Sequence, residues 1–155
     1  MAIRQAVPAD AGELIRLRAI LLRTFDMPGW NDDWREPARR TLVEQLGRPA
    51  ATLGAFVVDR PAGDGLAACA LGQIEQRLGN PANPDGRIGY VYNVVTDVDM
   101  RRRGYSRACM EALLEWFRER GVRAADLRAS ADGEALYESL GFRRSHEPGM
   151  RLTIS

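Results

Sequence analysis

The sequence has no lysine, a single histidine and only two cysteines among its 155 residues. Without lysine, a Schiff-base lysine is excluded. His146 alone supports neither a histidine-based triad nor a multi-histidine metal site, and its Ser-His-Glu-Pro context is typical of a surface turn. Cys69 and Cys109 lie far apart in apolar surroundings, which indicates neither a disulfide framework nor a metal cluster. We therefore expect a reduced, cytoplasmic protein without a metal.

The chain also lacks a strong charge bias and any long apolar run. Its formal net charge is +1, so it has no global preference for nucleic acid or for an acidic membrane surface. No apolar segment approaches the length that crosses a bilayer, and residues 1 to 10 do not form a secretion signal. With 45% hydrophobic and 28% charged residues, the composition is globular. We expect residues 1 to 155 to form one domain that binds neither nucleic acid nor membranes.

Apolar residues recur at helical spacing in four stretches, which we expect to be helices: residues 10 to 23, 33 to 46, 105 to 119 and 132 to 140. Asp10 and Glu13 resemble a capping box at the start of the first helix. Asp132 is the expected N-cap of the last helix. Gly121 is well placed as the C-cap of the third, which carries the clearest apolar stripe.

Between the helical stretches the pattern changes to that of strands. An opening strand is followed by strands expected at residues 51 to 59, 66 to 76, 88 to 96, 125 to 130, 142 to 145 and 150 to 154. Turn formers at residues 60 to 65 favour an antiparallel hairpin, and two Asn-Pro steps within residues 78 to 86 indicate an exposed loop. The prediction is a layered α/β (α+β) domain with a mixed, mostly antiparallel sheet of about seven strands and about four helices.

Residues 94 to 107 run out of a strand, through an arginine-rich turn and directly into the third helix. The first turn of a helix exposes unpaired N–H groups and the positive end of the helix dipole, which together attract phosphate. Gly104 lets a ligand approach the backbone closely, and Ser106 adds a hydroxyl donor. Three consecutive arginines and Arg107, one turn on, place guanidinium groups around the same mouth. The segment predicts a pyrophosphate or phosphate site; the alternative is a solvated basic helix start.

The spacing of Thr96, Arg101, Gly104 and Ser106 resembles the acetyl-CoA signature of the GNAT superfamily of N-acetyltransferases, with Thr96 and Ser106 as departures from it. Residues 136 to 142, Leu-Tyr-Glu-Ser-Leu-Gly-Phe, are similar to the family's second hallmark, a tyrosine-bearing helix that ends in Gly-Phe. The order of elements also matches over essentially the whole chain. The resemblance implies an acetyl-CoA-dependent enzyme that transfers an acetyl group directly to a primary amine of a small molecule or a protein. A noncatalytic acyl-CoA sensor of the same fold is the alternative.

The resemblance further implies which residues contact acetyl-CoA. In the family, a bulge splays the strand that holds residues 94 to 96 from its parallel neighbour and opens a V-shaped cleft. The backbone of these residues faces the acetyl and pantetheine portion, and the arginine-rich turn cradles the pyrophosphate. The expected acetyl-CoA-binding residues are Val94, Val95, Thr96, Arg101, Arg102, Arg103, Gly104, Tyr105, Ser106 and Arg107.

The transfer requires a proton for the departing thiolate and a neutral amine. Tyr137 matches the family's tyrosine and is the implied general acid, although a purely structural core tyrosine is the alternative. A backbone N–H within residues 94 to 96 is expected to stabilise the thioester oxygen. For the general base, three candidates stay open: Asp126, Glu75 and Tyr92.

In this family the acceptor pocket is built by the first two helices and the hairpin loops, which here means residues 25 to 35 and 78 to 87. Phe25, Trp30 and Trp34, with neighbouring aspartates, could form an aromatic, acidic pocket for a cationic amine. Alternatively, the two tryptophans seal the core. The sequence does not identify the amine and leaves a homodimer open.

Overall fold

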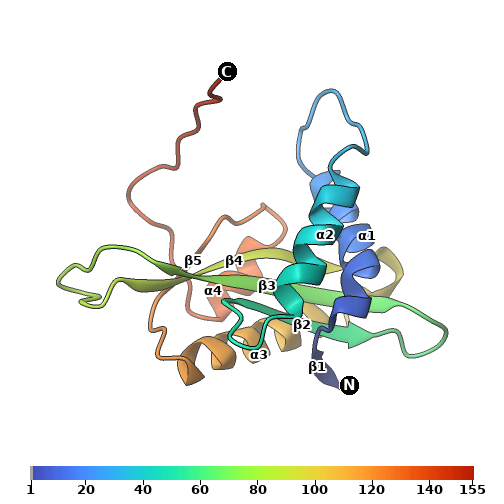
Figure 1. The fold of residues 1–155 in the computed structure, drawn as a ribbon, viewed down its shortest axis with the longest axis horizontal. Helices are drawn as coiled ribbons and strands as arrows, with labels where there is room; N and C mark the ends of the chain where they lie inside the picture. Colours follow the sequence, from blue (N-terminus) through green and yellow to red (C-terminus); the bar gives the residue numbers. More distant parts are fainter. Residues whose placement is uncertain (1) are drawn as a thin grey trace.

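The computed structural model describes residues 2 to 155, which form one sheet of five strands with α-helices on both faces (Figure 1). The strands are β1 (Ile3–Gln5), β2 (Leu53–Asp59), β3 (Leu66–Gln76), β4 (Arg87–Thr96) and β5 (Ala125–Leu127). The α-helices are α1 (Ala11–Leu22), α2 (Arg35–Leu46), α3 (Tyr105–Glu119) and α4 (Glu134–Ser139). The strands lie in chain order across the sheet, and neighbours are antiparallel except for the parallel pair β4 and β5. The predicted mixed, mostly antiparallel α/β fold is confirmed.

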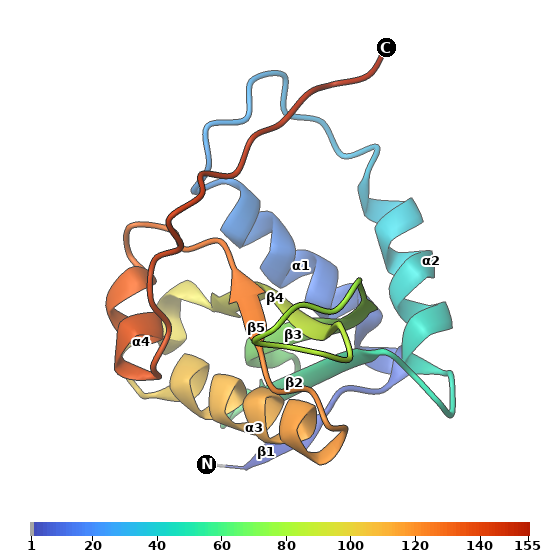
Figure 2. The same cartoon turned by 90° about the vertical axis from the view of Figure 1, so that its left-hand side faces the viewer.

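The sheet separates two apolar cores. Figure 2 shows α1 and α2 on one side of the sheet and α3 on the other, with α4 beside α3. Helix α1 contributes Leu14 and Leu17 to the first core, and α3 contributes Met110 and Leu113 to the second; all four side chains are fully buried. Each such side chain stabilises the fold by about 1.5–3 kcal/mol relative to exposure. The helical spacing that predicted α1 and α3 therefore reflects real packing against the sheet.

Helix α3 approaches the sheet closely because glycines in the strands leave room for its aromatic side chains. A Cβ atom at Gly72 would lie 2.6 Å from Phe117 Cζ and 3.0 Å from Leu113 Cδ1. We therefore expect Gly72→Ala to lower the free energy of unfolding by about 1–3 kcal/mol through overpacking. Gly12→Ala in α1, where a Cβ meets no atom within 4 Å, should have the opposite effect because alanine is the better helix former. Urea denaturation measures both variants, and a midpoint for Gly72→Ala at or above that of the wild type would contradict this packing argument.

Two predicted helix caps are wrong. Asp10 makes no cap hydrogen bond to α1; its carboxylate instead pairs with Arg4 and accepts the N–H of Val7 at 2.8 Å. Glu13 reaches across to the N–H of Leu66, also at 2.8 Å, because an arginine one turn on holds it toward the β2–β3 hairpin.

At α4, the hydroxyl of Ser130 accepts the N–H of Gly133 at 3.2 Å, so the serine takes the role predicted for Asp132. At α1 the expected capping groups are engaged elsewhere, and at α4 a neighbouring serine makes the local backbone bond instead.

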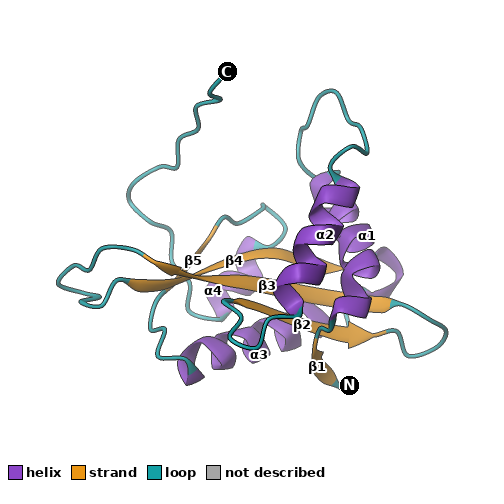
Figure 3. Cartoon of the chain, in the orientation of Figure 1, coloured by secondary structure: helices purple, strands orange, loops and turns teal. Residues whose placement is uncertain are grey.

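The predicted strands at residues 142 to 145 and 150 to 154 are also absent from the described chain, where this segment is an extended loop (Figure 3). Met150, Leu152 and Ile154 alternate as a strand would, yet they are 81–89% exposed. Alternation predicts a strand only where a sheet edge pairs with it, and β5 pairs with β4 over just three residues. Residues 128 to 130, also predicted as strand, turn away toward α4.

A bulge in β4 opens the sheet. Cys69 of β3 lies opposite Val95, whereas Leu71 lies opposite Tyr92, so β4 carries one extra residue across this step. Asn93 absorbs it with a φ of 52°, and the parallel pairing with β5 ends at Val91, just before the bulge. The expected splay of β4 from β5 is therefore present. No helix formed by residues 2 to 155 is long and apolar enough to cross a bilayer.

Candidate active site

A cavity of about 810 Å³ lies between the end of β4, the start of α3, the end of α1 and the loop leading into α4. The splay of β4 from β5 and the short α4 together leave this space. Its lining includes all of the predicted acetyl-CoA-binding residues except Arg103, together with the predicted acid: Val94, Val95, Thr96, Arg101, Arg102, Gly104, Tyr105, Ser106, Arg107 and Tyr137. The two sequence hallmarks, about 30 residues apart in the chain, thus meet at one site.

The start of α3 is an uncapped helix terminus. Gly104 is its N-cap with φ 79° and ψ 14°, and no side chain caps the first turn. The Ala108 N–H donates to the Gly104 carbonyl at 3.1 Å, which is the start of the helical hydrogen bonding. The N–H groups of the residues before Ala108 have no partner within the helix. Arg102 also has a positive φ, 65°, so two left-handed residues flank one position of the turn. Such a backbone directs successive N–H groups toward one anion.

The arginines of this turn have different surroundings. Arg101 and Arg102 line the cavity, whereas Arg103 does not. Arg107 Nη2 donates to Ser139 Oγ at 2.9 Å and so ties α3 to α4 across the cavity rim. Of the four arginines predicted to surround one mouth, three line the cavity: Arg101, Arg102 and Arg107. All three are exposed, and Arg107 also bonds to α4.

The two departures from the family signature contact each other. The hydroxyl groups of Thr96 and Ser106 form a hydrogen bond that joins the end of β4 to the first turn of α3. Both residues line the cavity. This bond fixes the end of β4 relative to the start of α3, two elements that line opposite parts of the cavity.

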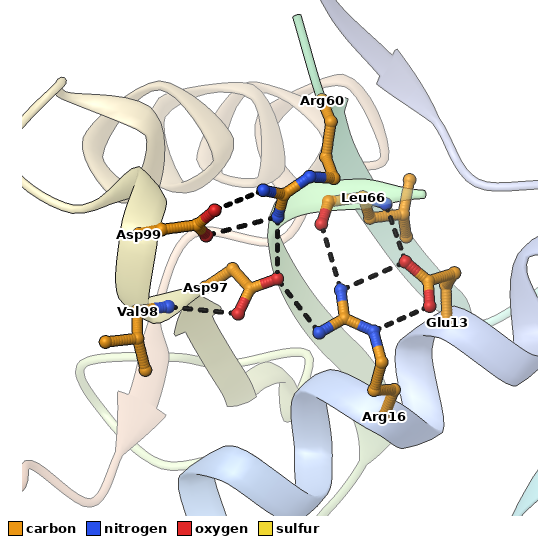
Figure 4. Close-up of polar contacts among 7 residues, drawn as sticks. All are labelled: Glu13, Arg16, Arg60, Leu66, Asp97, Val98 and Asp99. Carbon is orange, nitrogen blue, oxygen red and sulfur yellow. Dashed lines mark hydrogen bonds and ion pairs between the residues drawn. The ribbon is translucent and has the colours of Figure 1, made fainter. Parts of the chain in front are cut away.

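A network of ion pairs holds the base of the arginine turn (Figure 4). The Asp97 side chain is 12% exposed, and its carboxylate pairs with Arg60 at 2.8 Å and with Arg16 at 2.9 Å. It also accepts the N–H of Val98 at 3.0 Å, which fixes the short 3-10 turn Val98–Met100 that leads into the arginines. Asp97 therefore joins α1 and the end of β2 to the arginine-rich turn.

Each arginine of this network is itself held by a second carboxylate. Arg16 bonds to Glu13 and to the Leu66 carbonyl, and Arg60 bonds to Asp99. These hydrogen bonds lower the pKa of Glu13 and that of Asp99 below their ordinary values. Both carboxylates therefore stay charged at neutral pH, and the network persists there.

Asp97→Asn is expected to weaken acetyl-CoA binding about tenfold, because the turn loses two ion pairs while the protein keeps its cavity lining. Calorimetric titration of acetyl-CoA measures the change. Glu36→Gln is the control, since Glu36 pairs with Arg39 within α2 and lies outside both the network and the cavity lining. Equal dissociation constants for the two variants would show that the network does not position the turn.

Tyr137 lies on α4 at the boundary between two cavities. It lines both the 810 Å³ cavity and a neighbouring one of about 370 Å³ beside β5. Its side chain is 9% exposed and packs edge-on against Phe142, with ring centroids 6.1 Å apart. Burial raises the pKa of the Tyr137 phenol above its ordinary value, so the group keeps its proton at neutral pH. A protonated phenol at the cavity wall is what a general acid requires.

The three candidate bases lie apart from the 810 Å³ cavity. Glu75 pairs with Arg77 at 2.7 Å, and the same arginine lies 3.7 Å from Asp126. Tyr92 packs in the core beneath α1, where burial raises its pKa and disfavours the phenolate that a base would need. Asp126 is the one of the three that shares a cavity, the 370 Å³ one, with Tyr137. The structure thus separates the candidates by position, and the base remains a prediction.

Of the predicted acceptor residues, Phe25 lines the 810 Å³ cavity, whereas Trp30 and Trp34 do not. The tryptophans pack edge-on with centroids 6.0 Å apart, and Trp34 also contacts the core between α1 and α2. Arg23 stacks over Trp30 at 4.2 Å, and Arg35 lies 5.2 Å from the Trp34 ring. Asp32 pairs with Arg35 at 2.7 Å, so a carboxylate and two arginines lie near the two rings. The contact of Trp34 with the core supports the core-sealing alternative for this residue.

Sequence reasoning missed Asn93, which forms the bulge, and its hydrogen-bond partner Arg18. Asn93 is 4% exposed, and its Oδ1 accepts a hydrogen bond from Arg18 Nη1 at 3.1 Å. Its carbonyl accepts the thiol of Cys69 at 3.2 Å. An asparagine within a run of β-branched and aromatic residues was the available signal, because asparagine tolerates a positive φ better than its neighbours do.

Residues 16–142 match the model of the acetyltransferase (GNAT) family. The chain belongs to the GNAT family. This confirms the resemblance found in the sequence.

The [ribosomal protein bS18]-alanine N-acetyltransferase of Escherichia coli K12 is 41% identical over 66 residues, which span 37% of this chain and 45% of that relative. A solved structure of a predicted acetyltransferase with acetyl-CoA from Clostridium acetobutylicum has a TM-score of 0.84 at 22% identity and covers 98% of this chain and 95% of its own. A GCN5-related N-acetyltransferase from Ralstonia eutropha JMP134 has a TM-score of 0.82 at 22% identity, with 97% of each chain covered. At such identities the structural likeness shows the shared fold.

Proposed function

We propose that this chain is an acetyl-CoA-dependent N-acetyltransferase that moves an acetyl group directly to a primary amine. The observation that carries the proposal is the presence of an uncapped α3 N-terminus and a protonated, buried tyrosine on one cavity. The first suits a pyrophosphate, and the second suits a departing thiolate. When bound, acetyl-CoA supplies the activated acetyl group as a thioester.

The residues of the cavity fit such a molecule from end to end. At the α3 end, a Cβ built on Gly104 meets no atom within 4 Å, so the space over the first-turn N–H groups is open. Arg101 and Arg102 add cationic side chains at the same end. At the other end the wall becomes apolar, with Val94 and Val95 of β4. A phosphate-binding end and an apolar end are the chemistry that a pyrophosphate joined to pantetheine needs.

Each proposed step uses a group of this chain. A backbone N–H of Val94 or Val95 beside the bulge stabilises the negative charge that develops on the thioester oxygen. Tyr137 donates its proton to the thiolate as the carbon–sulfur bond breaks. Asp126 is the favoured base among the three candidates because it shares a cavity with Tyr137, and it takes the amine proton through ordered water since it lies outside the larger cavity.

The test is transfer of labelled acetyl from acetyl-CoA to a panel of acceptors. The panel holds free amino acids, their carboxamides, simple alkylamines and a peptide with an N-terminal alanine, the acceptor type that the E. coli relative's name indicates. Labelled N-acetyl product supports the enzyme. Tight acetyl-CoA binding without transfer to any acceptor would favour the noncatalytic acyl-CoA sensor, and absence of binding would contradict both.

A further inference from the structure

Arg18 is a partly buried cation that no carboxylate balances. It lies on α1, and its one hydrogen bond within the described chain goes to the neutral amide of Asn93, at 3.1 Å. Among residues 2 to 155, no carboxylate forms an ion pair with it. A guanidinium removed from water without a counter-charge destabilises a protein unless a partner supplies the charge. The bond to Asn93 uses Nη1 of the Arg18 guanidinium and leaves its other nitrogens available as donors.

The position of Arg18 is beside the apolar end of the 810 Å³ cavity. Leu21, one turn further along α1 on the same side, lines that cavity, and so does Phe25 just beyond the end of the helix. Asn93, its partner, directly precedes Val94, which lines the cavity from β4. Arg18 therefore lies next to the backbone proposed to face the thioester, at the opposite end from the phosphate-binding turn.

The acidic side chains of this sheet face do not balance Arg18. Glu75 lies four residues after the core residue Leu71 on β3. Because side chains alternate along a strand, Glu75 shares the sheet face covered by α1, as Tyr92 of β4 does. Asp126 lies opposite Tyr90, two residues from Tyr92, and so points to the same face. However, both carboxylates flank Arg77, at 2.7 and 3.7 Å. The face therefore offers an acceptor a cation that forms no ion pair, beside the proposed reaction centre.

We infer that Arg18 binds a carboxylate of the acceptor, and that the acceptor carries this carboxylate within a few bonds of the reacting amine, as free α-amino acids do. This inference rests on the proposed function and names the substrate class of the same site. A guanidinium matches a carboxylate in a two-point hydrogen-bonded pair, which fixes the orientation of the attached amine. An amine without a neighbouring carboxylate gains nothing from Arg18.

The experiment compares each amino acid with its carboxamide as acceptors, in the wild type and in three variants. Arg18→Gln removes the cation, Arg18→Lys keeps it, and Arg40→Gln removes an exposed arginine of α2 as the control. In the wild type, kcat/KM should be about 10- to 100-fold higher for a carboxylate than for its carboxamide. Arg18→Gln should abolish that ratio through KM, Arg18→Lys should restore part of it, and Arg40→Gln should keep it.

A second variant tests the same pairing without removing the arginine. Asn93→Asp keeps a residue that tolerates the positive φ of the bulge and places a carboxylate where the Arg18 hydrogen bond ends. The carboxylate preference should then fall as in Arg18→Gln. If both variants lower transfer to carboxylates and carboxamides equally, Arg18 has only a structural role at the bulge and the inference is overturned.

The inference and the proposed function can fail separately. Acetyl-CoA titration and transfer to any amine test the function, whereas the carboxylate-to-carboxamide ratio tests Arg18. If no acceptor of the panel reacts, N-acetylated amino acids are titrated into the CoA complex. Binding by the wild type that Arg18→Gln weakens about tenfold or more supports the inference, and equal or absent binding overturns it.

Discussion

Gly104→Glu is expected to weaken acetyl-CoA binding about 100-fold or more, which corresponds to about 2.7 kcal/mol. The new carboxylate would occupy the open space above the first turn of α3 and place a negative charge where the pyrophosphate is proposed to bind. Calorimetric titration with acetyl-CoA measures the loss.

The backbone effect of this substitution needs its own control. Gly104 has a φ of 79°, a conformation that costs a residue with a side chain about 1–2 kcal/mol. Gly63, in the turn between β2 and β3, has the same φ of 79° and is equally open to solvent. Gly63→Glu therefore carries the same strain and charge at a distance from the cavity, and it should bind acetyl-CoA as the wild type does. Undiminished acetyl-CoA binding by Gly104→Glu would contradict the proposal that the pyrophosphate binds at the start of α3.

Tyr137→Phe is expected to lower kcat about 100-fold and to leave acetyl-CoA affinity nearly unchanged, as when only proton transfer in the transition state is lost. Since burial raises the pKa of Tyr137, the acid form is fully present at neutral pH, and its contribution should decline only as the pH rises through that elevated value. Steady-state kinetics over pH with calorimetry measure both effects.

The control for this variant is Tyr90→Phe, which removes a phenol that lies outside the 810 Å³ cavity. It should retain the wild-type kcat. A Tyr137→Phe enzyme with full turnover would assign Tyr137 a role in packing against Phe142 alone.

Strong local patterns made much of the fold and of the cavity lining at the start of α3 predictable. The stripe of α3 is set by helical spacing, and the turn before it needs a residue at positive φ, which Gly104 supplies. The spacing of Thr96, Gly104 and Tyr137 connected these local patterns to one family, whose model the chain matches. Local signals suffice here because a helix start and its preceding turn are neighbours in sequence.

The parts that could not be predicted depend on contacts between distant residues. The Arg16–Asp97–Arg60 network joins three segments, and none of the three shows in its own sequence which charge it will meet. The alternation of Met150 and Ile154 gave no information about whether a sheet edge pairs with them. The same limit applies to the general base, because its identity depends on where an acceptor sits.

The arrangement of the site suggests a division between its two ends. At the α3 end, hydrogen bonds and ion pairs from Asp97 and Ser106 fix the backbone that is proposed to hold the phosphates. At the β4 end, the bulge at Asn93 and the neighbouring Arg18 shape the region that is proposed to receive the acceptor. Variants of the first end should change acetyl-CoA affinity, and variants of the second should change acceptor preference.

A crystal structure of the protein with bound CoA tests the central claim most directly. The proposal predicts pyrophosphate oxygens within about 2.7–3.2 Å of the backbone N–H groups of residues 102 to 106, with the thiol directed toward Val94 and Tyr137. A CoA molecule bound with its pyrophosphate elsewhere, for instance in the 370 Å³ cavity beside β5, would contradict the account.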